Sequence, residues 1–184
     1  MSVFSRTELS NLVEVLRADG VVVMPTDTVY GIVGSVNSHE TVEKIFDIKK
    51  RINNLGTILF ANKQQLSDFG FDENLLEKAM KYWPGPVSVV LPAPADKKYL
   101  AKDWDSLAVR IPEPEWLNTL LLKTGPLVTT SANLPDEPTV TDIDQAKKVF
   151  GDKVDFYLDG GTVSDAKPSK IVKIADDGII ETLR

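Results

Sequence analysis

The stretch that decides the fold is Val21-Val22-Val23-Met24-Pro25-Thr26-Asp27-Thr28-Val29-Tyr30-Gly31-Ile32-Val33-Gly34. Its first four residues are apolar and mostly β-branched, which predicts a buried strand. Pro25 lacks a backbone donor, so ladder pairing is expected to stop there. The next residues offer three hydroxyls and a carboxylate, and two glycines let the backbone turn or approach a ligand closely. The pattern predicts either a binding site at a strand end or a turn with satisfied hydroxyls.

Length, composition and charge predict one globular domain over residues 1–184. A chain of 184 residues is long enough for one core and short for two domains. Its contents of 42% hydrophobic and 26% charged residues are ordinary for a globular protein. The net charge of -6 argues against a surface that binds nucleic acid or an anionic membrane. The absence of cysteine excludes disulfides, a thiol nucleophile and a cysteine-ligated zinc. No apolar run reaches the roughly 18 residues that span a bilayer, and the first residues lack a signal-peptide pattern, so we expect a cytoplasmic protein.

Helical and strand patterns are mixed along the chain. Ser5, Ser38 and Asp72 are expected to cap helices, and Gly20 to end the first of them. Strands are predicted at residues 57–61, 87–91, 107–111, 127–130, 156–158, 170–174 and 179–183, with further helices near 116–121 and 143–150. Because Asp176-Asp177-Gly178 is typical of a hairpin turn, the last two strands should be antiparallel. We expect an α/β fold whose twisted mixed sheet is flanked by helices.

Several familiar active sites are excluded by the residues present. His39 is the one histidine and is expected on the surface near a helix cap, so a Ser-His-Asp triad or a zinc site is not expected. The nearest match to a Walker A loop begins at Gly161 and lacks both the second glycine and the Ser/Thr. No Gly-x-Gly-x-x-Gly follows a strand, so a Rossmann dinucleotide site is not supported.

Polar and cationic clusters at the ends of predicted elements are the remaining signal. Lys49-Lys50-Arg51 ends a helix, where a solvated terminus is the simpler interpretation. Arg110 lies within an apolar strand, which favours an anionic ligand over a structural ion pair. Thr129-Thr130-Ser131-Ala132-Asn133 follows a strand and suits either oxyanion binding or an Asx or Ser turn. Together the clusters predict an anion pocket without a nucleophile, which suits nucleotidyl transfer.

Six segments carry a resemblance to a known family. They are Pro25-Thr26-Asp27-Thr28-Val29-Tyr30-Gly31, Lys49-Lys50-Arg51, Trp83-Pro84-Gly85-Pro86-Val87, Ser106-Leu107-Ala108-Val109-Arg110-Ile111, Thr130-Ser131-Ala132-Asn133 and Pro168-Ser169-Lys170-Ile171-Val172. In this order they resemble the YrdC-type threonylcarbamoyl-AMP synthases, in the short single-domain form. The resemblance implies a YrdC-like fold with a central ligand cavity. It also implies a cytoplasmic nucleotidyltransferase of tRNA modification.

The implied reaction converts L-threonine, bicarbonate or CO2, and ATP into L-threonylcarbamoyladenylate and pyrophosphate. The product would serve N6-threonylcarbamoyladenosine (t6A) modification at tRNA position 37. Mg²⁺ is expected to accompany ATP, and a tRNA-modifying threonylcarbamoyl transferase is the expected downstream partner. Direct RNA binding is expected to be weak at most, and no membrane partner is expected.

The resemblance also assigns roles to individual residues. Lys49 and Arg51 would be the catalytic pair that faces the phosphates, and Arg110 would bind the threonine carboxylate. The full L-threonine set is Thr28, Tyr30, Arg110, Thr129 and Ser169. The full ATP set is Lys49, Arg51, Ser106, Ser131, Asn133, Thr139 and Arg184. No residue is assigned to a metal, and Asp27 is expected only to stabilise a turn.

The chain departs from the common family pattern at a few positions. Ile52 and Gly56-Thr57 stand where many members carry proline and Pro-Leu, and Phe60 stands where longer relatives carry histidine. Two alternatives to the synthase remain. One is an RNA-binding YrdC-like module without adenylation activity. The other is a carbamoyl-adenylate enzyme of the hydrogenase-maturation type, whose cysteine-rich zinc motifs this chain lacks.

Overall fold

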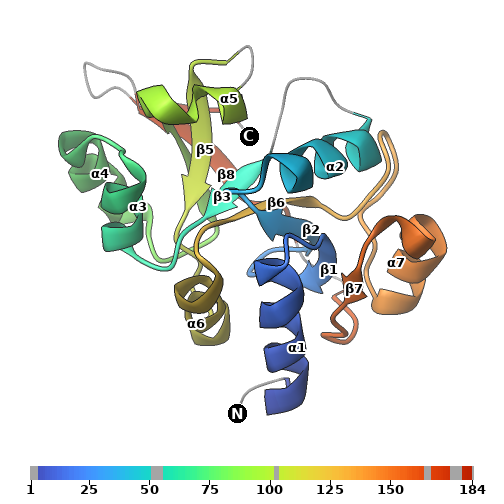
Figure 1. Ribbon diagram of the computed structural model, residues 1–184. Helices are drawn as coiled ribbons and strands as arrows, with labels where there is room; N and C mark the ends of the chain where they lie inside the picture. Colours follow the sequence, from blue (N-terminus) through green and yellow to red (C-terminus); the bar gives the residue numbers. More distant parts are fainter. Residues whose placement is uncertain (1–3, 51–55, 102–103, 164–166, 175–179, 184) are drawn as a thin grey trace.

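The fold is built on one mixed sheet. The computed structural model describes residues 4–50, 56–101, 104–163, 167–174 and 180–183. Strands in these ranges join in the order β7-β1-β2-β6-β3-β5-β4-β8-β9 (Figure 1). They are β1 (Val22–Pro25), β2 (Tyr30–Ser35), β3 (Thr57–Leu59), β4 (Val87–Pro92), β5 (Ser106–Arg110), β6 (Leu127–Ser131), β7 (Phe156–Tyr157), β8 (Lys170–Ile174) and β9 (Ile180–Thr182). Three neighbouring pairs are parallel and five antiparallel, which confirms the predicted mixed sheet.

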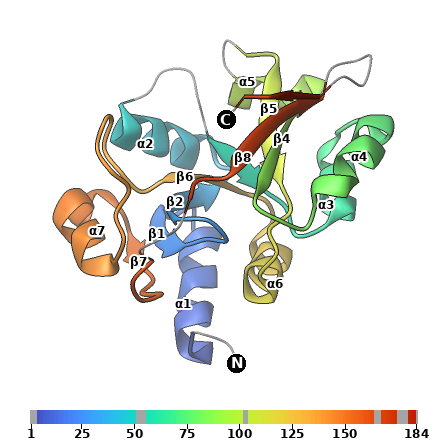
Figure 2. The ribbon, with the colours of Figure 1, turned by 180° about the vertical axis from the view of Figure 1, so that it is seen from behind.

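Helices flank the sheet and close two apolar cores. They are α1 (Arg6–Arg17), α2 (His39–Lys49), α3 (Lys63–Phe69), α4 (Glu73–Ala79), α5 (Lys98–Ala101), α6 (Glu115–Thr124) and α7 (Ile143–Phe150). Helices α1 and α6 lie side by side in both Figure 1 and Figure 2, and they pack on Val22 and Met24. Helices α2, α3, α4 and α7 share the second core with Val23 and Ile32. Because successive strand residues point to opposite faces, the apolar run of β1 serves both cores.

The opening stretch is a β-hairpin rather than a strand followed by a polar loop. β1 pairs with β2 along its whole length, and the ladder ends at the pair of Pro25 and Tyr30, so pairing stops at Pro25 as expected. Pro25 is the last residue of its strand, a position where proline is tolerated. The connecting turn is closed by Thr26, whose backbone N–H and hydroxyl both donate to the carbonyl of Val29, at 3.2 and 2.7 Å.

The two glycines of the stretch lie inside β2 and allow close packing instead of a turn. A Cβ on Gly31 would lie 2.5 Å from Oγ1 of Thr129, and one on Gly34 would lie 2.3 Å from Cγ2 of Thr41. Gly31 therefore brings the hairpin against β6. Gly34 does the same for α2.

The capping predictions are confirmed, and one helix end is corrected. Ser5 forms the predicted capping box with Glu8, and Ser38 and Asp72 cap α2 and α4. Helix α1 ends at Arg17, and the left-handed backbone position belongs to Asp19 (φ 62°) instead of Gly20. Helix α3 was not predicted, and the expected turn at 176–178 lies outside the described residues.

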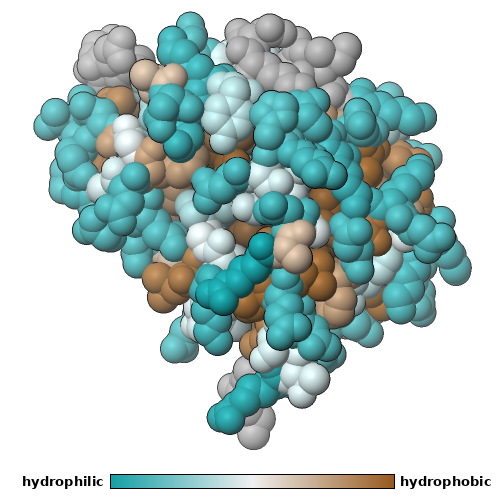
Figure 3. Space-filling view, in the orientation of Figure 1, coloured by the Kyte–Doolittle hydropathy of each residue, from teal (hydrophilic) through white to brown (hydrophobic). Residues whose placement is uncertain are grey.

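One face of the molecule is polar in character (Figure 3). The face in Figure 3 is mostly hydrophilic, with scattered apolar side chains between the charged ones. His39 is exposed, as expected, and its ring stacks on Tyr99 with centroids 5.9 Å apart. Over the residues that the structure describes, no helix is both long and apolar enough to cross a membrane.

Candidate active site

A cavity of about 450 Å³ lies on one face of the sheet, a volume typical of small-molecule sites. Its floor follows one line of the strand register, in which Thr129, Thr57, Ala108, Val90 and Lys173 stand opposite one another in successive strands. Residues opposite one another share a face, so five strands present one side chain each to the same space. The hairpin turn, α5 and the segment before β8 form the walls.

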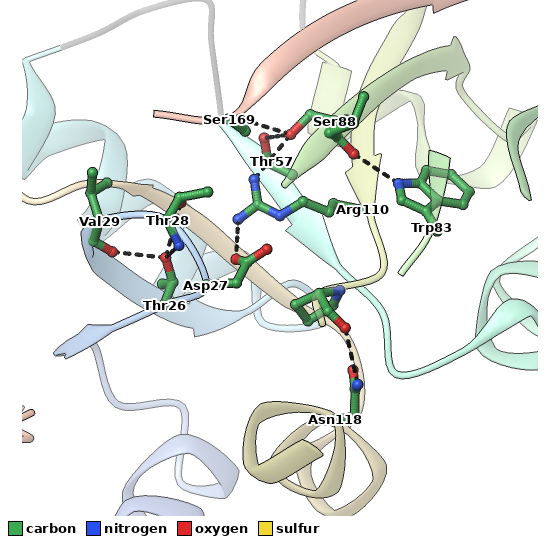
Figure 4. Close-up of polar contacts among 12 residues, drawn as sticks. Thr26, Asp27, Thr28, Val29, Thr57, Trp83, Ser88, Arg110, Asn118 and Ser169 are labelled. Carbon is green, nitrogen blue, oxygen red and sulfur yellow. Dashed lines mark hydrogen bonds and ion pairs between the residues drawn. The ribbon is translucent and has the colours of Figure 1, made fainter. Parts of the chain in front are cut away.

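Arg110 lines this cavity at the end of β5 and is only 2% exposed. Its Nη2 donates to Oδ1 of Asp27 at 2.8 Å, and both side chains of this pair are 3% exposed (Figure 4). The pairing corrects the expectation that Asp27 only stabilises the turn. Burial raises the pKa of the Asp27 carboxyl, while the Arg110 guanidinium opposes that rise.

Ser88 connects Arg110 to two hydroxyls of the cavity wall. It accepts a hydrogen bond from Nη1 of Arg110 at 3.2 Å and donates to Ser169 at 3.0 Å, and its Oγ lies 2.9 Å from Oγ1 of Thr57. Since the one Ser88 proton goes to Ser169, Thr57 must donate to Ser88. Sequence reasoning missed Ser88; the available signal was a single hydroxyl within the apolar strand β4.

The hairpin turn presents its hydroxyls at the opposite wall. Oγ1 of Thr26 lies 3.2 Å from Oγ1 of Thr28 and accepts from the Thr28 backbone N–H at 3.2 Å. Thr26, Thr28 and Val29 line the cavity. Asp27, between them, turns inward to Arg110. The turn thus supplies hydroxyls to the cavity and a carboxylate to Arg110.

Lys49 is the second buried cation, 1% exposed at the end of α2. Its Nζ donates to the carbonyl of Ser131 (2.8 Å) and to the carbonyl and Oδ1 of Asn133 (2.6 and 2.8 Å). The simpler interpretation of a solvated helix end is therefore wrong for Lys49. Lys50 ends the helix in the left-handed region (φ 47°) with an exposed side chain, whereas the Lys49 side chain is buried.

Comparison with known proteins identifies the family to which this chain is related. A sequence model of the Sua5/YciO/YrdC family, described as "Telomere recombination", matches residues 14–184. The chain belongs to the Sua5/YciO/YrdC family. This confirms the predicted resemblance.

Individual relatives are similar over most of the chain. A putative threonylcarbamoyl-AMP synthase of Methanocaldococcus jannaschii is 34% identical over 87% of this chain and 77% of its own length. The threonylcarbamoyl-AMP synthase of Marinobacter nauticus is 32% identical over 88% of both chains. These names are those of enzymes that form an adenylate, in agreement with the predicted enzyme class.

A solved family structure has the same fold. The crystal structure of P. abyssi Sua5 complexed with L-threonine superposes with a TM-score of 0.86 at 26% identity. The match covers 98% of this chain, and this chain spans about half the length of P. abyssi Sua5.

The structure brings together half of the residues that the family resemblance singled out. Six of them line the cavity: Thr28, Ser106, Arg110, Thr129, Ser131 and Ser169. Lys49, Asn133 and Thr139 do not line it, although Lys49 and Asn133 bond to each other beside Ser131. Arg51 and Arg184 lie outside the described residues.

Tyr30, a member of the predicted L-threonine set, does not line the cavity. The residue is fully buried, and its hydroxyl accepts from the N–H of Gly160 at 2.9 Å and donates to the carbonyl of Gly161 at 2.8 Å. Tyr30 thus fastens β2 to the chain after β7. Phe60 is also fully buried and packs on the rings of Phe69 and Phe71.

The cavity has further lining residues that the motifs did not indicate. Thr57, Lys173 and Glu181 add polar groups, and Trp104, 60% exposed, adds an aromatic ring. They come from β3, β8, β9 and the chain before β5. Only the sheet order, which interleaves distant segments, shows that these residues share one space.

Proposed function

We propose that this chain is an L-threonylcarbamoyladenylate synthase that uses L-threonine, bicarbonate or CO2, and ATP. The observation that carries the proposal is the buried Arg110 in a cavity lined by hydroxyl side chains. It is supported by relatives of this name that match the chain over most of their own length. A guanidinium fork matches a carboxylate with two hydrogen bonds. Arg110 would hold the threonine carboxylate, with Thr28, Thr129 and Ser169 around the rest of the amino acid.

The reaction needs positioning more than a nucleophilic side chain. The threonine amine adds to CO2 and loses a proton, giving a carbamate. A carbamate oxygen attacks the α-phosphorus of ATP, the bond to the β-phosphate oxygen breaks, and pyrophosphate leaves. Because the nucleophile belongs to the substrate, the cavity has to align the two reactants and stabilise the charge on the phosphates.

The ATP side would be organised by Lys49. Its three hydrogen bonds fix the segment from Ser131 to Asn133 at the cavity wall and place a buried positive charge behind it. Arg51, Ser106, Thr139 and Arg184 complete the proposed ATP set. Within the described ranges, no group of three or more histidine and carboxylate side chains is placed to hold a metal. Mg²⁺ would therefore be held mainly by the phosphates of the nucleotide.

The product is a mixed carbamic–phosphoric anhydride, which water hydrolyses readily. A transferase that moves the threonylcarbamoyl group to adenosine 37 of tRNA is therefore the proposed consumer, and the cytoplasm is the proposed compartment. Residues 1–184 would form the catalytic domain. The names of the relatives favour this activity over a non-catalytic RNA-binding module.

Pyrophosphate release tests the proposal. The purified chain with Mg-ATP should release pyrophosphate only when both L-threonine and bicarbonate are present, and serine should support less turnover than threonine. Release that is indifferent to threonine would contradict the proposal. Salt-sensitive tRNA binding without any turnover would favour the RNA-binding module instead.

A further inference from the structure

The buried carboxylate of Asp27, which contacts Arg110, has no role in the proposed reaction. Oδ1 of Asp27 lies 2.8 Å from Nη2 of Arg110, and both side chains are 3% exposed. Within the described residues, Oδ2 of Asp27 is buried without a hydrogen-bond partner. Arg110 lines the cavity and Asp27 does not, so any effect of Asp27 on a ligand passes through Arg110.

The net charge of the Asp27–Arg110 pair decides which ligands bind favourably beside it. An isolated buried guanidinium favours any small anion, because an unpaired buried charge is costly. Bicarbonate and pyrophosphate are both anions of the proposed reaction. With Asp27 in contact, the pair is neutral, and a simple carboxylate that binds there leaves one uncompensated negative charge. A zwitterionic amino acid adds none, since its ammonium cancels its carboxylate.

We propose that Asp27 is a specificity-determining positioning residue, which cancels the charge of Arg110 so that the site selects zwitterionic amino acids over simple carboxylates. The inference rests on the proposed function, in which Arg110 binds the threonine carboxylate. On this proposal, the neutral pair would also disfavour bicarbonate and pyrophosphate at that position. Ser88 holds the other terminal nitrogen of Arg110, so the guanidinium keeps its place while Asp27 sets the charge.

The test compares two ligands that differ only in the amine. L-Threonine and 3-hydroxybutyrate share the carboxylate, the hydroxyl and the carbon skeleton, and their dissociation constants can be measured by calorimetry without ATP. Asp27→Asn keeps a hydrogen-bond acceptor for Arg110 and removes the charge. In this variant, we expect the dissociation constant of 3-hydroxybutyrate, divided by that of threonine, to fall by about tenfold or more. This size is in keeping with one buried charge. An unchanged ratio of the two constants would overturn the inference.

Asp155→Asn is the matched control. Asp155 forms an ion pair of nearly the same length with Lys44, 2.7 Å, but outside the cavity and with side chains that are 44% and 38% exposed. The ligand ratio should stay at the wild-type value. A shift as large as that of Asp27→Asn would mean a general effect of net charge, and would also overturn the inference.

The wild-type chain gives a second test if Asp27→Asn does not fold. L-Threoninamide carries only the positive charge and 3-hydroxybutyrate only the negative one. Both should bind about tenfold or more weakly than threonine, because each leaves an uncompensated charge. Anion binding as tight as threonine binding would refute the role of Asp27. Since ATP is absent, this result is independent of pyrophosphate release, so failure of the proposed function and failure of the inference can be told apart.

Discussion

Arg110 and Lys49 are both buried cations, yet their surroundings differ. Arg110 is 2% exposed, and a carboxylate oxygen lies 2.8 Å from its Nη2. Lys49 is 1% exposed, and its Nζ donates to three uncharged oxygens of Ser131 and Asn133. Arg110 lines the cavity, whereas Lys49 lies behind its wall.

The difference separates two ways in which a fold presents positive charge to a ligand. The contact with Asp27 cancels the charge of Arg110 and leaves the directional fork, which suits recognition of one carboxylate. The carbonyl and amide oxygens that Lys49 Nζ contacts carry no full charge, unlike the carboxylate on Arg110. That arrangement suits a polyanion such as the triphosphate of ATP. The two sites should therefore fail differently when they are mutated.

Arg110→Ala should have the largest effect. Loss of two charge-assisted hydrogen bonds, each worth about 1.5–3 kcal/mol, predicts a rise of about 100-fold or more in the threonine KM. The variant also leaves Asp27 buried without its partner, which should lower the free energy of unfolding by about 3–5 kcal/mol. Steady-state pyrophosphate release and chemical denaturation measure the two effects. An unchanged threonine KM would remove Arg110 from the carboxylate role.

Lys49→Met should impair ATP use and spare threonine. The variant keeps the approximate length of the side chain but removes the Nζ that donates to oxygens of Ser131 and Asn133. We expect kcat/KM for ATP to fall by about 100-fold, because a buried charge and its ordered wall are both lost. The threonine dissociation constant without ATP should stay within about twofold of wild type. A rise in the threonine dissociation constant as large as that expected for Arg110→Ala would contradict separate roles for Arg110 and Lys49.

Ser88→Ala should weaken threonine binding without abolishing it. The change removes one hydrogen bond to Arg110 and the shared partner of Thr57 and Ser169. Asp27 still holds the guanidinium, so a rise of about tenfold in the threonine KM is expected, in keeping with about 1–2 kcal/mol. Ser88→Thr, which keeps the hydroxyl, is the control and should stay closer to wild type.

Asp155→Asn should have the smallest effect and one that depends on pH. Partial burial alone would raise the pKa of Asp155, but the hydrogen bonds from Lys44 and from the Val21 N–H outweigh it and hold the pKa below its ordinary value. A carboxyl with a lowered pKa stabilises the fold above its unfolded pKa, and this stabilisation is lost as the pH falls through the folded pKa.

The variant should therefore be less stable by about 0.5–1 kcal/mol at pH 7, reduced by the exposure of the pair. The difference from wild type should vanish in acid. Denaturation at several pH values measures this. A difference that persists below pH 3 would show that the charge of Asp155 is not its source.

The sequence predicted the elements better than it predicted their contacts. Capping residues and apolar periodicity are local, so the N-terminal ends of α2 and α4 and most strands were predicted. The strand β2 was missed because Tyr30 and the two glycines resemble a polar turn, and only their pairing with β1 and β6 shows that they belong to the sheet. The site was predicted by residue type, but the partners of Arg110 come from segments 83 and 22 positions away.

The most direct measurement is a crystal structure of the chain with L-threonine bound. The account predicts the threonine carboxylate within hydrogen-bond distance of the Arg110 guanidinium, with Asp27 still on Nη2 and Ser88 on Nη1. Threonine bound away from Arg110 would contradict it. So would a threonine carboxylate that has displaced Asp27, since Asp27 would then not cancel the charge of Arg110 when the ligand is bound.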